Sequence, residues 1–271
     1  MSDELPAPTK TAAPVSQQVT KTRWPHNVTT LGVDVGGSGV KASVLDAKGN
    51  MITERVRVDT PYPCTPTTLV NTISELVKPL PATQRISVGF PGLVRDGVVV
   101  QVPALSRLEY GGENDPTMAA RWHGFDLADA LAQAFTVPIK VVNDADMQGC
   151  AVATGDGYEF VMTLGTGVGC AQFFQGKLLP HIELSHGPFK KGMTTDYALG
   201  NVNRKAIGNK KWRKWVNEAI HWFDEMLFFD KILIGGGNAK KLRLADLPPK
   251  AQVVPNTAGI IGGVRVWDLA D

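Results

Sequence analysis

An acidic residue followed by a run of small residues is the feature of this chain best suited to chemistry. Asp34 lies in an apolar run that leads into a turn made of Gly36, Gly37, Ser38 and Gly39. Glycines have no side chain, so successive backbone amides can approach a bound anion and form a nest around it. A carboxylate just before such a turn could hold a metal ion beside the anion. This combination predicts a site that handles phosphate groups.

The glycine turn differs from the two best-known phosphate-binding patterns. Its spacing is not that of the dinucleotide-binding fingerprint, and the residues that follow it, 40–45, are strand-like rather than helical. The P-loop pattern occurs nowhere in the sequence. Taken alone, the turn could also be an ordinary glycine hairpin in a β-rich domain.

The second half of the chain repeats the same theme. A strand predicted at 160–164 leads into a glycine turn, Gly165–Gly169, and a returning strand at 170–174; a third glycine run, 235–237, follows a buried strand. Two strand–turn–strand units in matching places favour two related lobes over unrelated hairpins in one domain. A cleft between the lobes would direct both turns toward one ligand.

Periodicity and turn residues predict the remaining elements. Strands are expected at 29–35, 40–45, 51–58, 85–90, 98–102, 139–142 and 231–234. Helices are expected at 66–78, 126–135, 144–153, 212–229 and from 257 onward, with a polar loop at 104–124. These elements predict an α/β fold with an N-terminal lobe over 27–142 and a C-terminal lobe over 143–256, and the last helix, 257–271, could join the first lobe.

Composition narrows the class of protein. The 271 residues are 43% apolar and 20% charged with a net charge of +2, so no overall field favours nucleic acid or a membrane. No stretch approaches the roughly 18 apolar residues that span a bilayer. Cys64, Cys150 and Cys170 form no paired motif, which indicates reduced thiols in the cytoplasm. Residues 1–26, rich in Pro, Thr, Ala and Ser, are predicted to be a disordered leader.

Six segments, in this order, resemble the ROK family of sugar kinases and repressors. They are Gly32–Lys41, Gly89–Gly92, Asn143–Ala145, Leu164–Gly169, Glu183–His186 and Ile234–Gly237. Together they extend over nearly everything from residue 29 to the C-terminus. Within the family the chain is most similar to polyphosphate glucokinases, which share the form of the first turn and a Lys-, Arg- and Trp-rich helix. The resemblance implies a two-lobed actin-like/hexokinase (ribonuclease H-like) fold with a cleft between the lobes.

The resemblance implies a catalytic role for Asp144. The family uses the matching acid as the base that accepts the proton of the sugar's 6-hydroxyl. Phosphoryl transfer needs mainly alignment and charge neutralisation, so one well-placed carboxylate is sufficient. Capping of the following helix is an alternative role that Asp144 could fill as well. Asp146, two residues further on, would point elsewhere on the helix and is the weaker candidate.

The sugar is expected to bind next to this acid. The family pair that grips vicinal hydroxyls corresponds to Glu183 and His186, whose spacing places them on one side of a helix or turn. A structural role is the alternative for His186, and His181 has no assigned role. The resemblance also places Asn143 and Gly92 against the sugar.

The donor phosphates and a metal ion are expected at the glycine turns. The donor-binding residues implied are Gly36, Gly37, Ser38, Lys41, Gly165, Thr166, Gly167, Gly236 and Gly237. Asp34 is expected to place Mg²⁺ directly or through water, because this ion keeps most of its waters. The third glycine run would lie beneath a nucleoside if one binds; tight strand–helix packing is the alternative role of these glycines. Many family members carry a cysteine-rich zinc motif after the histidine, but residues 187–192 contain no cysteine, so no zinc is expected.

A cluster of basic residues bears on the choice of donor. Its members are Lys190, Lys191, Arg204, Lys205, Lys210, Lys211, Arg213 and Lys214. They could be a solvated face opposite Trp212, Trp215 and Val216. They could instead form a positive track to the cleft that favours polyphosphate over ATP and makes donor binding fall steeply with salt.

Two positions depart from the family pattern. Kinases of the family usually have an Asn where this chain has Ala104, and the longer segment that follows includes Asn114 and Asp115. Either a residue of that segment takes over the sugar contact or the pocket has changed. Ser185 replaces the usual Gly between Glu183 and His186. A buried hydroxyl without its partner costs about 1–3 kcal/mol, enough to shift sugar preference.

The sequence therefore predicts a kinase for the 6-hydroxyl of glucose or a related hexose, with Mg²⁺ and polyphosphate, ATP or both as donor. We expect a cytoplasmic homodimer without nucleic-acid or membrane partners. A sugar-sensing repressor would need a DNA-binding module that residues 1–26 cannot provide. Ala104 and Ser185 leave two alternatives: a catalytically weak sugar-binding regulatory protein, or a kinase for an amino sugar or polyol. Asp144 and the two glycine turns argue against the first of these.

Overall fold

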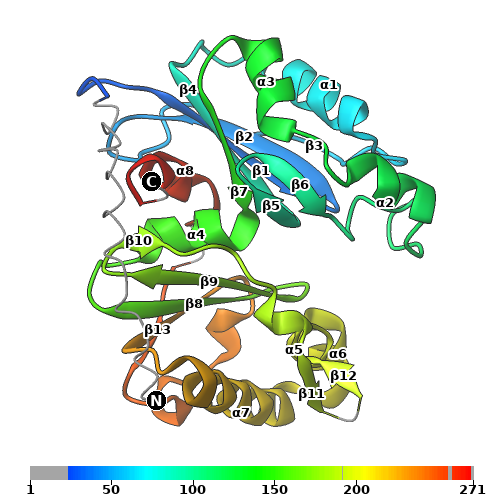
Figure 1. Cartoon of the computed structure of the whole chain (residues 1–271). Helices are drawn as coiled ribbons and strands as arrows, with labels where there is room; N and C mark the ends of the chain where they lie inside the picture. The colour runs from blue at the N-terminus through cyan, green and yellow to red at the C-terminus, as the bar shows by residue number, and fades with distance from the viewer. Residues whose placement is uncertain (1–23, 191, 256–257, 270–271) are drawn as a thin grey trace, which may run out of the picture.

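Two five-stranded sheets of like topology organise the chain (Figure 1). The computed structural model describes residues 24–190, 192–255 and 258–269. The first sheet has the order β3-β2-β1-β4-β7 and the second β10-β9-β8-β13-β14. In each sheet an antiparallel hairpin is extended on one side by two parallel strands. The repeat that the two glycine turns predict is therefore present in the strand order itself.

The strands and helices have the following bounds. The first sheet contains β1 (Thr30–Gly36), β2 (Gly39–Leu45), β3 (Val56–Val58), β4 (Arg85–Phe90) and β7 (Ile139–Asn143). The second contains β8 (Tyr158–Leu164), β9 (Val168–Phe174), β10 (Lys177–Leu178), β13 (Lys231–Gly235) and β14 (Ala251–Val253). Two small hairpins join β5 (Leu93–Arg95) to β6 (Val98–Gln101) and β11 (Pro188–Lys190) to β12 (Met193–Thr194). The helices are α1 (Pro66–Val77), α2 (Pro116–Trp122), α3 (Leu127–Phe135), α4 (Asp144–Val152), α5 (Thr195–Leu199), α6 (Asn201–Ile207), α7 (Asn209–Leu227) and α8 (Ala258–Leu269).

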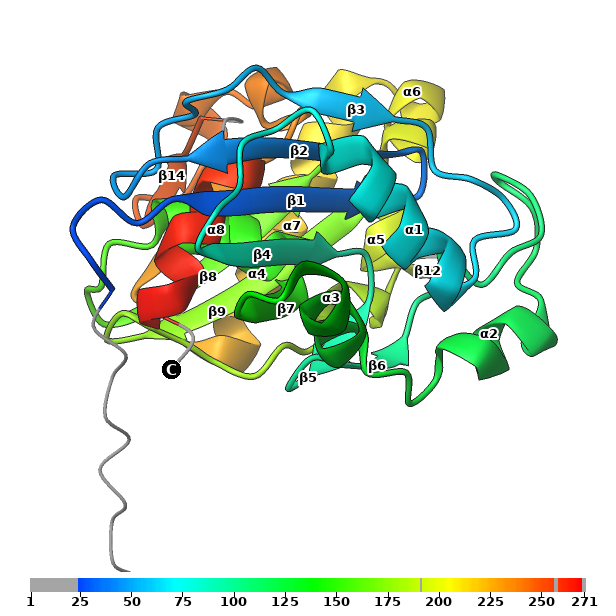
Figure 2. The same cartoon turned by 90° about the horizontal axis from the view of Figure 1, so that it is seen from above.

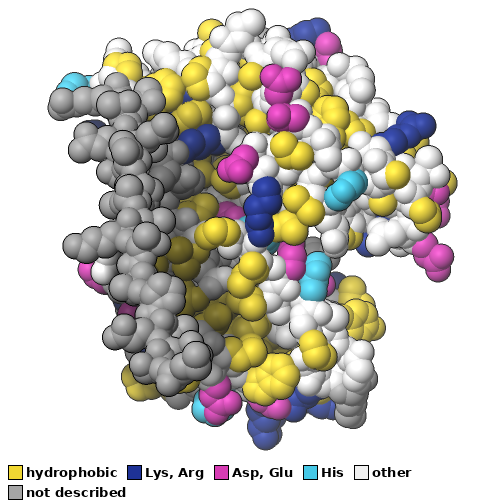
Figure 3. Space-filling view, in the orientation of Figure 1, with side chains coloured by type: hydrophobic (Ala, Val, Ile, Leu, Met, Phe, Trp, Pro, Cys, Tyr) yellow, Lys and Arg dark blue, Asp and Glu magenta, His cyan; other side chains and the backbone are white. Residues whose placement is uncertain are grey.

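Helices cover both sheets and build a separate core in each lobe. Helices α1 and α3 lie over the outer face of the first sheet, and α7 lies over the outer face of the second (Figures 1 and 2). Ile73 of α1 and Leu131 of α3 are fully buried in the first core. Trp212 and Ile220 of α7 are buried in the second. The surface is indented between the two lobes, on the side of α2 and α5 (Figure 3).

Helix α8, from the C-terminal end of the chain, lies between the sheets beside α4 and packs on β1 and β4 of the first lobe (Figure 1). Glycines on both sides of these contacts permit the close approach. A Cβ added at Gly32 of β1 would lie 2.6 Å from Cγ2 of Ile260. A Cβ added at Gly262 would overlap the carbonyl oxygen of Met147 in α4. The C-terminal helix therefore connects the sheet of one lobe to the first helix of the other.

Several details differ from the sequence predictions. The polar loop expected at 104–124 contains helix α2, which starts at Pro116 because Oδ1 of Asp115 accepts a hydrogen bond from the Met118 amide at 2.8 Å. Strand β3 is shorter than predicted, since Met51 makes only an isolated bridge to Leu45. Helix α7 starts at Asn209 rather than Trp212.

The predicted leader, residues 1–26, falls mostly outside the described residues. Trp24, which is described, lies edge-on to Trp267 of α8 with ring centroids 5.2 Å apart. The guanidinium of Arg85 lies 4.9 Å from the Trp24 ring. In the described part of the chain, no helix combines the length and the apolar character that crossing a membrane requires.

Candidate active site

The first lobe brings three strand ends together at the centre of the candidate site. In the parallel pairs β1–β4 and β4–β7, Asp34 is opposite Gly89, and Gly89 is opposite Val142. Chain segments that leave these strands at their carboxyl ends therefore meet at one edge of the sheet, as in other open α/β sheets that bind ligands there. Asp144 follows β7 directly and is the first residue of α4.

Asn143, rather than Asp144, caps helix α4. Oδ1 of Asn143 accepts a hydrogen bond from the Ala145 amide at 2.7 Å, and its Nδ2 donates to the carbonyl oxygen of Gly92 at 3.0 Å. A side chain at position 92 would overlap the backbone of Gln101, so this position in the loop requires a glycine. Asn143 and Gly92, both predicted to contact sugar, thus brace the strand end that carries Asp144. Oδ1 of Asp144 also accepts from the Ala145 amide, at 2.9 Å.

Asp144 has an unusual electrostatic environment. Burial raises the pKa of Asp144 to about 7, with the charge of Asp34 next and that of Glu183 weaker. The hydrogen bond from the Ala145 amide and the charge of His181 act in the opposite direction. Asp34 comes from β1 of the first lobe and Glu183 from the second half of the chain. A carboxyl group with a pKa near neutrality is suited to accept a proton at physiological pH.

The first glycine turn is the tight hairpin that the sequence predicts. Gly36 pairs with Gly39, and Gly37 and Ser38 form its tip. The Thr60 hydroxyl donates to the Gly36 carbonyl oxygen at 2.6 Å. The Tyr62 hydroxyl lies 2.7 Å from the carbonyl oxygen of Gly37 and 2.9 Å from that of Ala104. Tyr62 therefore ties this turn to Ala104, where the family Asn is missing.

Asp34 and Lys41 form an ion pair across the hairpin. Nζ of Lys41 lies 3.1 Å from Oδ2 of Asp34, and both side chains are part-exposed. A carboxylate next to the glycine turn supplies the oxygen ligands that a hydrated Mg²⁺ prefers. Lys41, which was predicted to contact the donor, forms an ion pair with Asp34 in this structure.

The second glycine turn is held by residues that the sequence did not indicate. The Val168 amide donates to Oδ1 of Asp196 at 2.7 Å. Nδ2 of Asn238 donates to the carbonyl oxygen of Gly165 at 2.9 Å, and the Asn201 amide donates to Thr166 O at 3.0 Å. These bonds fix the turn between β8 and β9 against α5, α6 and the loop after β13.

Two glycines of the third run have different surroundings. Gly236 has φ of +86°, and a Cβ there would overlap the backbone of Leu164, so this glycine serves tight packing at the end of β8. No heavy atom lies within 4 Å of the position that a Cβ would take at Gly237. Both glycines stay predicted donor contacts, and of the two only Gly237 has open space at the position of a Cβ.

Glu183 lies between two histidines. It precedes the single 3₁₀ turn Leu184–His186, and Oε2 of Glu183 is 3.8 Å from Nε2 of His186. Oε1 of Glu183 is 3.4 Å from Nε2 of His181, whose Nδ1 is 3.0 Å from Oδ1 of Asp146. The predicted pair is therefore present. Two further residues belong to the same cluster: His181, to which the sequence assigned no role, and Asp146, the weaker candidate for the catalytic acid.

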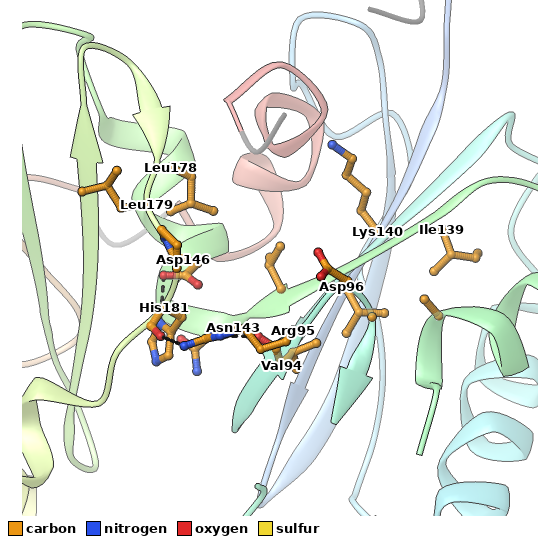
Figure 4. A pocket seen from close by; sticks show the side chains of 15 residues that line it. Val94, Arg95, Asp96, Ile139, Lys140, Asn143, Asp146, Leu178, Leu179 and His181 are labelled. Atoms are coloured by element: carbon orange, nitrogen blue, oxygen red, sulfur yellow. Dashed lines mark hydrogen bonds and ion pairs between the residues drawn. The ribbon is translucent and has the colours of Figure 1, made fainter. Parts of the chain in front are cut away.

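A cavity of about 480 Å³ adjoins this cluster (Figure 4). Its walls come from the β5–β6 hairpin, strand β7, and the chain after β10, and they include Asp146 and His181. Arg95 of β5 donates to the carbonyl oxygen of His181, which links the hairpin to the second half of the chain. Within the described ranges, no three His, Cys, Asp or Glu side chains are grouped so that they could hold a metal ion.

Two lobes of like topology, with a carboxylate where the strand ends meet and a glycine turn in each lobe, define the actin-like/hexokinase class of fold. The chain belongs to the ROK family, whose model matches residues 30–182. The polyphosphate glucokinase of Mycobacterium tuberculosis (strain CDC 1551 / Oshkosh) is 30% identical over 250 residues, 86% of this chain and 88% of that protein. An N-acetylmannosamine kinase of Escherichia coli (strain SE11) is 33% identical over 157 residues, 56% of this chain and 50% of that protein.

A solved structure supports the same fold. The inorganic polyphosphate/ATP-glucomannokinase of Arthrobacter sp. strain KM has a TM-score of 0.73 at 29% identity, covering 90% of this chain and 99% of that one. The predicted family and fold class are thus confirmed. These three relatives are all kinases of sugars, which supports a kinase that acts on a sugar.

Proposed function

We propose that this protein transfers a phosphoryl group to the 6-hydroxyl of glucose or a related hexose, with Asp144 as the base. The observation that carries the proposal is the position of Asp144, at the junction of β7 and α4, with a pKa raised to about 7 by burial and by the charges of Asp34 and Glu183. The polyphosphate glucokinase and glucomannokinase relatives support a hexose as substrate.

In the proposed reaction the sugar is held by Glu183 and His186, and Asp144 accepts the proton of the 6-hydroxyl. The hydroxyl oxygen attacks the terminal phosphorus of the donor, and the bond from that phosphorus to the rest of the donor breaks. Amides of the two glycine turns bind the donor phosphates. Mg²⁺ bound at Asp34 would neutralise charge on those phosphates. Closure of the lobes would exclude water, which otherwise competes as acceptor.

The proposed donor is polyphosphate, with ATP as a second donor. Helix α6 starts at Asn201, whose amide binds the second glycine turn, and its 7 residues extend about 10 Å to the start of α7. Lys205, Lys210, Lys211 and Lys214 are exposed along this path, whereas Trp212 and Trp215 point into the core. These four lysines are thus solvated residues of α6 and α7, and we infer that they extend a path from the second glycine turn. A chain of phosphates leaving the turn would meet these lysines.

These four lysines give a prediction about the donor. Replacing Lys205, Lys210, Lys211 and Lys214 together by Gln is expected to raise KM for long-chain polyphosphate about tenfold or more, because each lost phosphate contact weakens binding. KM for ATP should change less than about twofold. The same variant should show a shallower dependence of polyphosphate KM on salt. The control is Lys48→Gln with Lys78→Gln, which removes two exposed charges from the first lobe. Equal effects on both donors would contradict the polyphosphate track.

The pH dependence follows from Asp144. A base works only when deprotonated, and the raised pKa means that the carboxylate is lost at a higher pH than for an ordinary Asp. We expect kcat/KM for glucose to fall as the pH drops below the Asp144 pKa, by about tenfold per pH unit well below that point. The profile should be measured between pH 5.5 and 8.5 at saturating donor. A flat profile down to pH 5.5 would contradict this role for Asp144.

The function itself is tested by glucose 6-phosphate formation with Mg²⁺ and either polyphosphate or ATP, at low and high salt. Turnover with polyphosphate that falls steeply with salt would support both the hexokinase activity and the basic track. Absence of product with either donor would overturn glucose as substrate and favour a different sugar or a non-catalytic binder.

A kinase for an amino sugar is the second candidate. Ala104, whose carbonyl oxygen binds Tyr62, is smaller than the family Asn, and Asn114 is engaged by Arg107 while Asp115 caps α2, so neither replaces it directly. The N-acetylmannosamine kinase relative points in the same direction. A panel of glucose, mannose, glucosamine and N-acetylmannosamine, compared by kcat/KM, separates the two candidates.

A further inference from the structure

The carboxylate predicted to bind sugar is the end of a chain of three ionisable side chains. Asp146 of α4 lies 3.0 Å from Nδ1 of His181, and Nε2 of His181 lies 3.4 Å from Oε1 of Glu183. Asp146 and His181 point toward one another across the wall of the cavity in Figure 4. Asp146 and His181 are 3% and 7% exposed, whereas the Glu183 side chain is 29% exposed.

Two observations connect His181 to Glu183 within this set of three side chains. Nε2 of His181 is buried and, among the described residues, has only the Glu183 carboxylate within ion-pair distance and no fully formed hydrogen bond. A buried polar atom without a partner is unfavourable, so a small rotation of the Glu183 carboxylate onto Nε2 is favoured. Arg95 holds the main chain at the same point by donating to the His181 carbonyl oxygen.

We propose that His181, anchored by Asp146, is a positioning residue that orients the Glu183 carboxylate toward the hydroxyls of the sugar. The inference rests on the proposed function, because it assigns the role to the sugar-binding carboxylate of that function. His181 is only 7% exposed, and its assigned role is to act through Glu183 rather than to bind the sugar itself. Residues that hold a binding group in one geometry reduce the freedom that it loses when ligand binds.

The electrostatics agree with the geometry. Burial lowers the pKa of His181, but hydrogen bonds and charges of Asp146 and Glu183 outweigh this and raise it to about 9, so the imidazole is protonated at neutral pH. Burial alone would raise the pKa of Glu183. The hydrogen bond and the charge of His181 outweigh burial, so the pKa of Glu183 is lowered. The charged groups that interact with His181 are Asp146 and Asp144 from α4 and Glu183 from its own loop. Arg95 from β5 acts on Asp146, and His186 acts on Glu183.

Two variants separate positioning from simple structural support. In Asp146→Asn the imidazole keeps a hydrogen-bond acceptor but loses its counter-charge, so His181 should be neutral at pH 8 and protonated again at pH 5.5. We expect the Kd for glucose, relative to wild type at the same pH, to be about tenfold higher at pH 8 and within threefold at pH 5.5. In His181→Gln no proton can return, so the ratio should be about tenfold at both pH values. Binding is measured without donor, by calorimetry.

Controls and a second readout keep the result interpretable. His221→Gln, on the exposed face of α7 beside Glu225, should leave the Kd for glucose unchanged. Titration of His181 and Glu183 by NMR in the sugar-free protein is expected to show an imidazole that stays protonated above pH 8 and a Glu183 pKa that rises in Asp146→Asn.

The outcomes are distinct for the two proposals. A Kd ratio for Asp146→Asn that is the same at both pH values, or an ordinary Glu183 pKa that the variant does not change, would overturn the positioning role. If wild-type protein fails to bind glucose, the proposed substrate is wrong, and the NMR titration still decides whether His181 controls Glu183. A variant that does not fold leaves the wild-type titration as the deciding measurement, in which an ordinary His181 pKa overturns the inference.

Discussion

Replacing Asp144 by Asn is expected to lower kcat for hexose phosphorylation by about 10³-fold, within the range that one general base contributes. The amide has nearly the shape of the carboxylate and can still accept the hydrogen bond that the Ala145 amide donates at 2.9 Å. It cannot take up the proton of the sugar hydroxyl. Since Asn143 rather than Asp144 caps α4, the helix should keep its start.

The loss of activity in Asp144→Asn should be a decrease in kcat, with sugar binding nearly unchanged. The Kd for glucose, measured without donor, should change less than about threefold, because Glu183 and His186 are untouched and the variant removes one of several crowded negative charges. The matched control is Asp156→Asn, in an exposed carboxylate of the second lobe whose side chain is 86% exposed, and it should keep wild-type kcat. Near-normal kcat in Asp144→Asn would mean that another group accepts the proton.

The sequence predicted those parts of the site that depend on local spacing. Alternating apolar residues and a two-residue glycine tip specify the β1–β2 hairpin, so Asp34 and the turn come as one unit. The helix start at Asn143 and Asp144 is also visible locally. The role of Asp144 was expected from the resemblance to the ROK family, and the pairing of β1, β4 and β7 places it beside the turn. The same logic applied to β8 and β9 predicted the second lobe.

Parts of the site that depend on contacts between distant residues were not predicted. His181 and Asp146 are 35 residues apart, and nothing near either one shows that they meet at the side of Glu183. Asp196 and Asn238 bind the second glycine turn from 28 and 73 residues away. Such pairs follow from the packing of whole elements, which periodicity in a single sequence does not specify.

Helix α2, which the sequence analysis treated as part of a loop, did have a local signal in the sequence. Asp115 followed by Pro116 is a common start for a helix, with the acid as cap and the proline in the first turn. The glycines at 111 and 112 and the polar residues around them favoured a loop instead. Burial of Met118 and Trp122 on one face decided the outcome in the folded protein.

Replacing Gly262 by Ala is expected to destabilise the fold by about 3 kcal/mol, at the upper end of what overpacking usually costs. In an exposed helix the same change would stabilise by up to about 1 kcal/mol, since alanine has the higher helix propensity. The sign reverses here because the added methyl would overlap the carbonyl oxygen of Met147. That oxygen belongs to the backbone of α4 and cannot rotate away, so α8 has to separate from α4. Urea unfolding at constant pH measures the change.

Gly263→Ala is the matched control, one residue further along the same helix. Its added Cβ would lie 3.2 Å from Cβ of Ser87 and 3.7 Å from Cα of Gly32, contacts that a shift of a few tenths of an ångström relieves. Its effect on the free energy of unfolding should stay within about 1 kcal/mol, where helix propensity and mild crowding oppose one another. Equal effects of the two substitutions would mean that α8 does not lie as close to α4 as the structure shows. A large effect at Gly262 alone would establish that the C-terminal helix joins the two lobes by backbone contact, next to the helix that begins at Asp144.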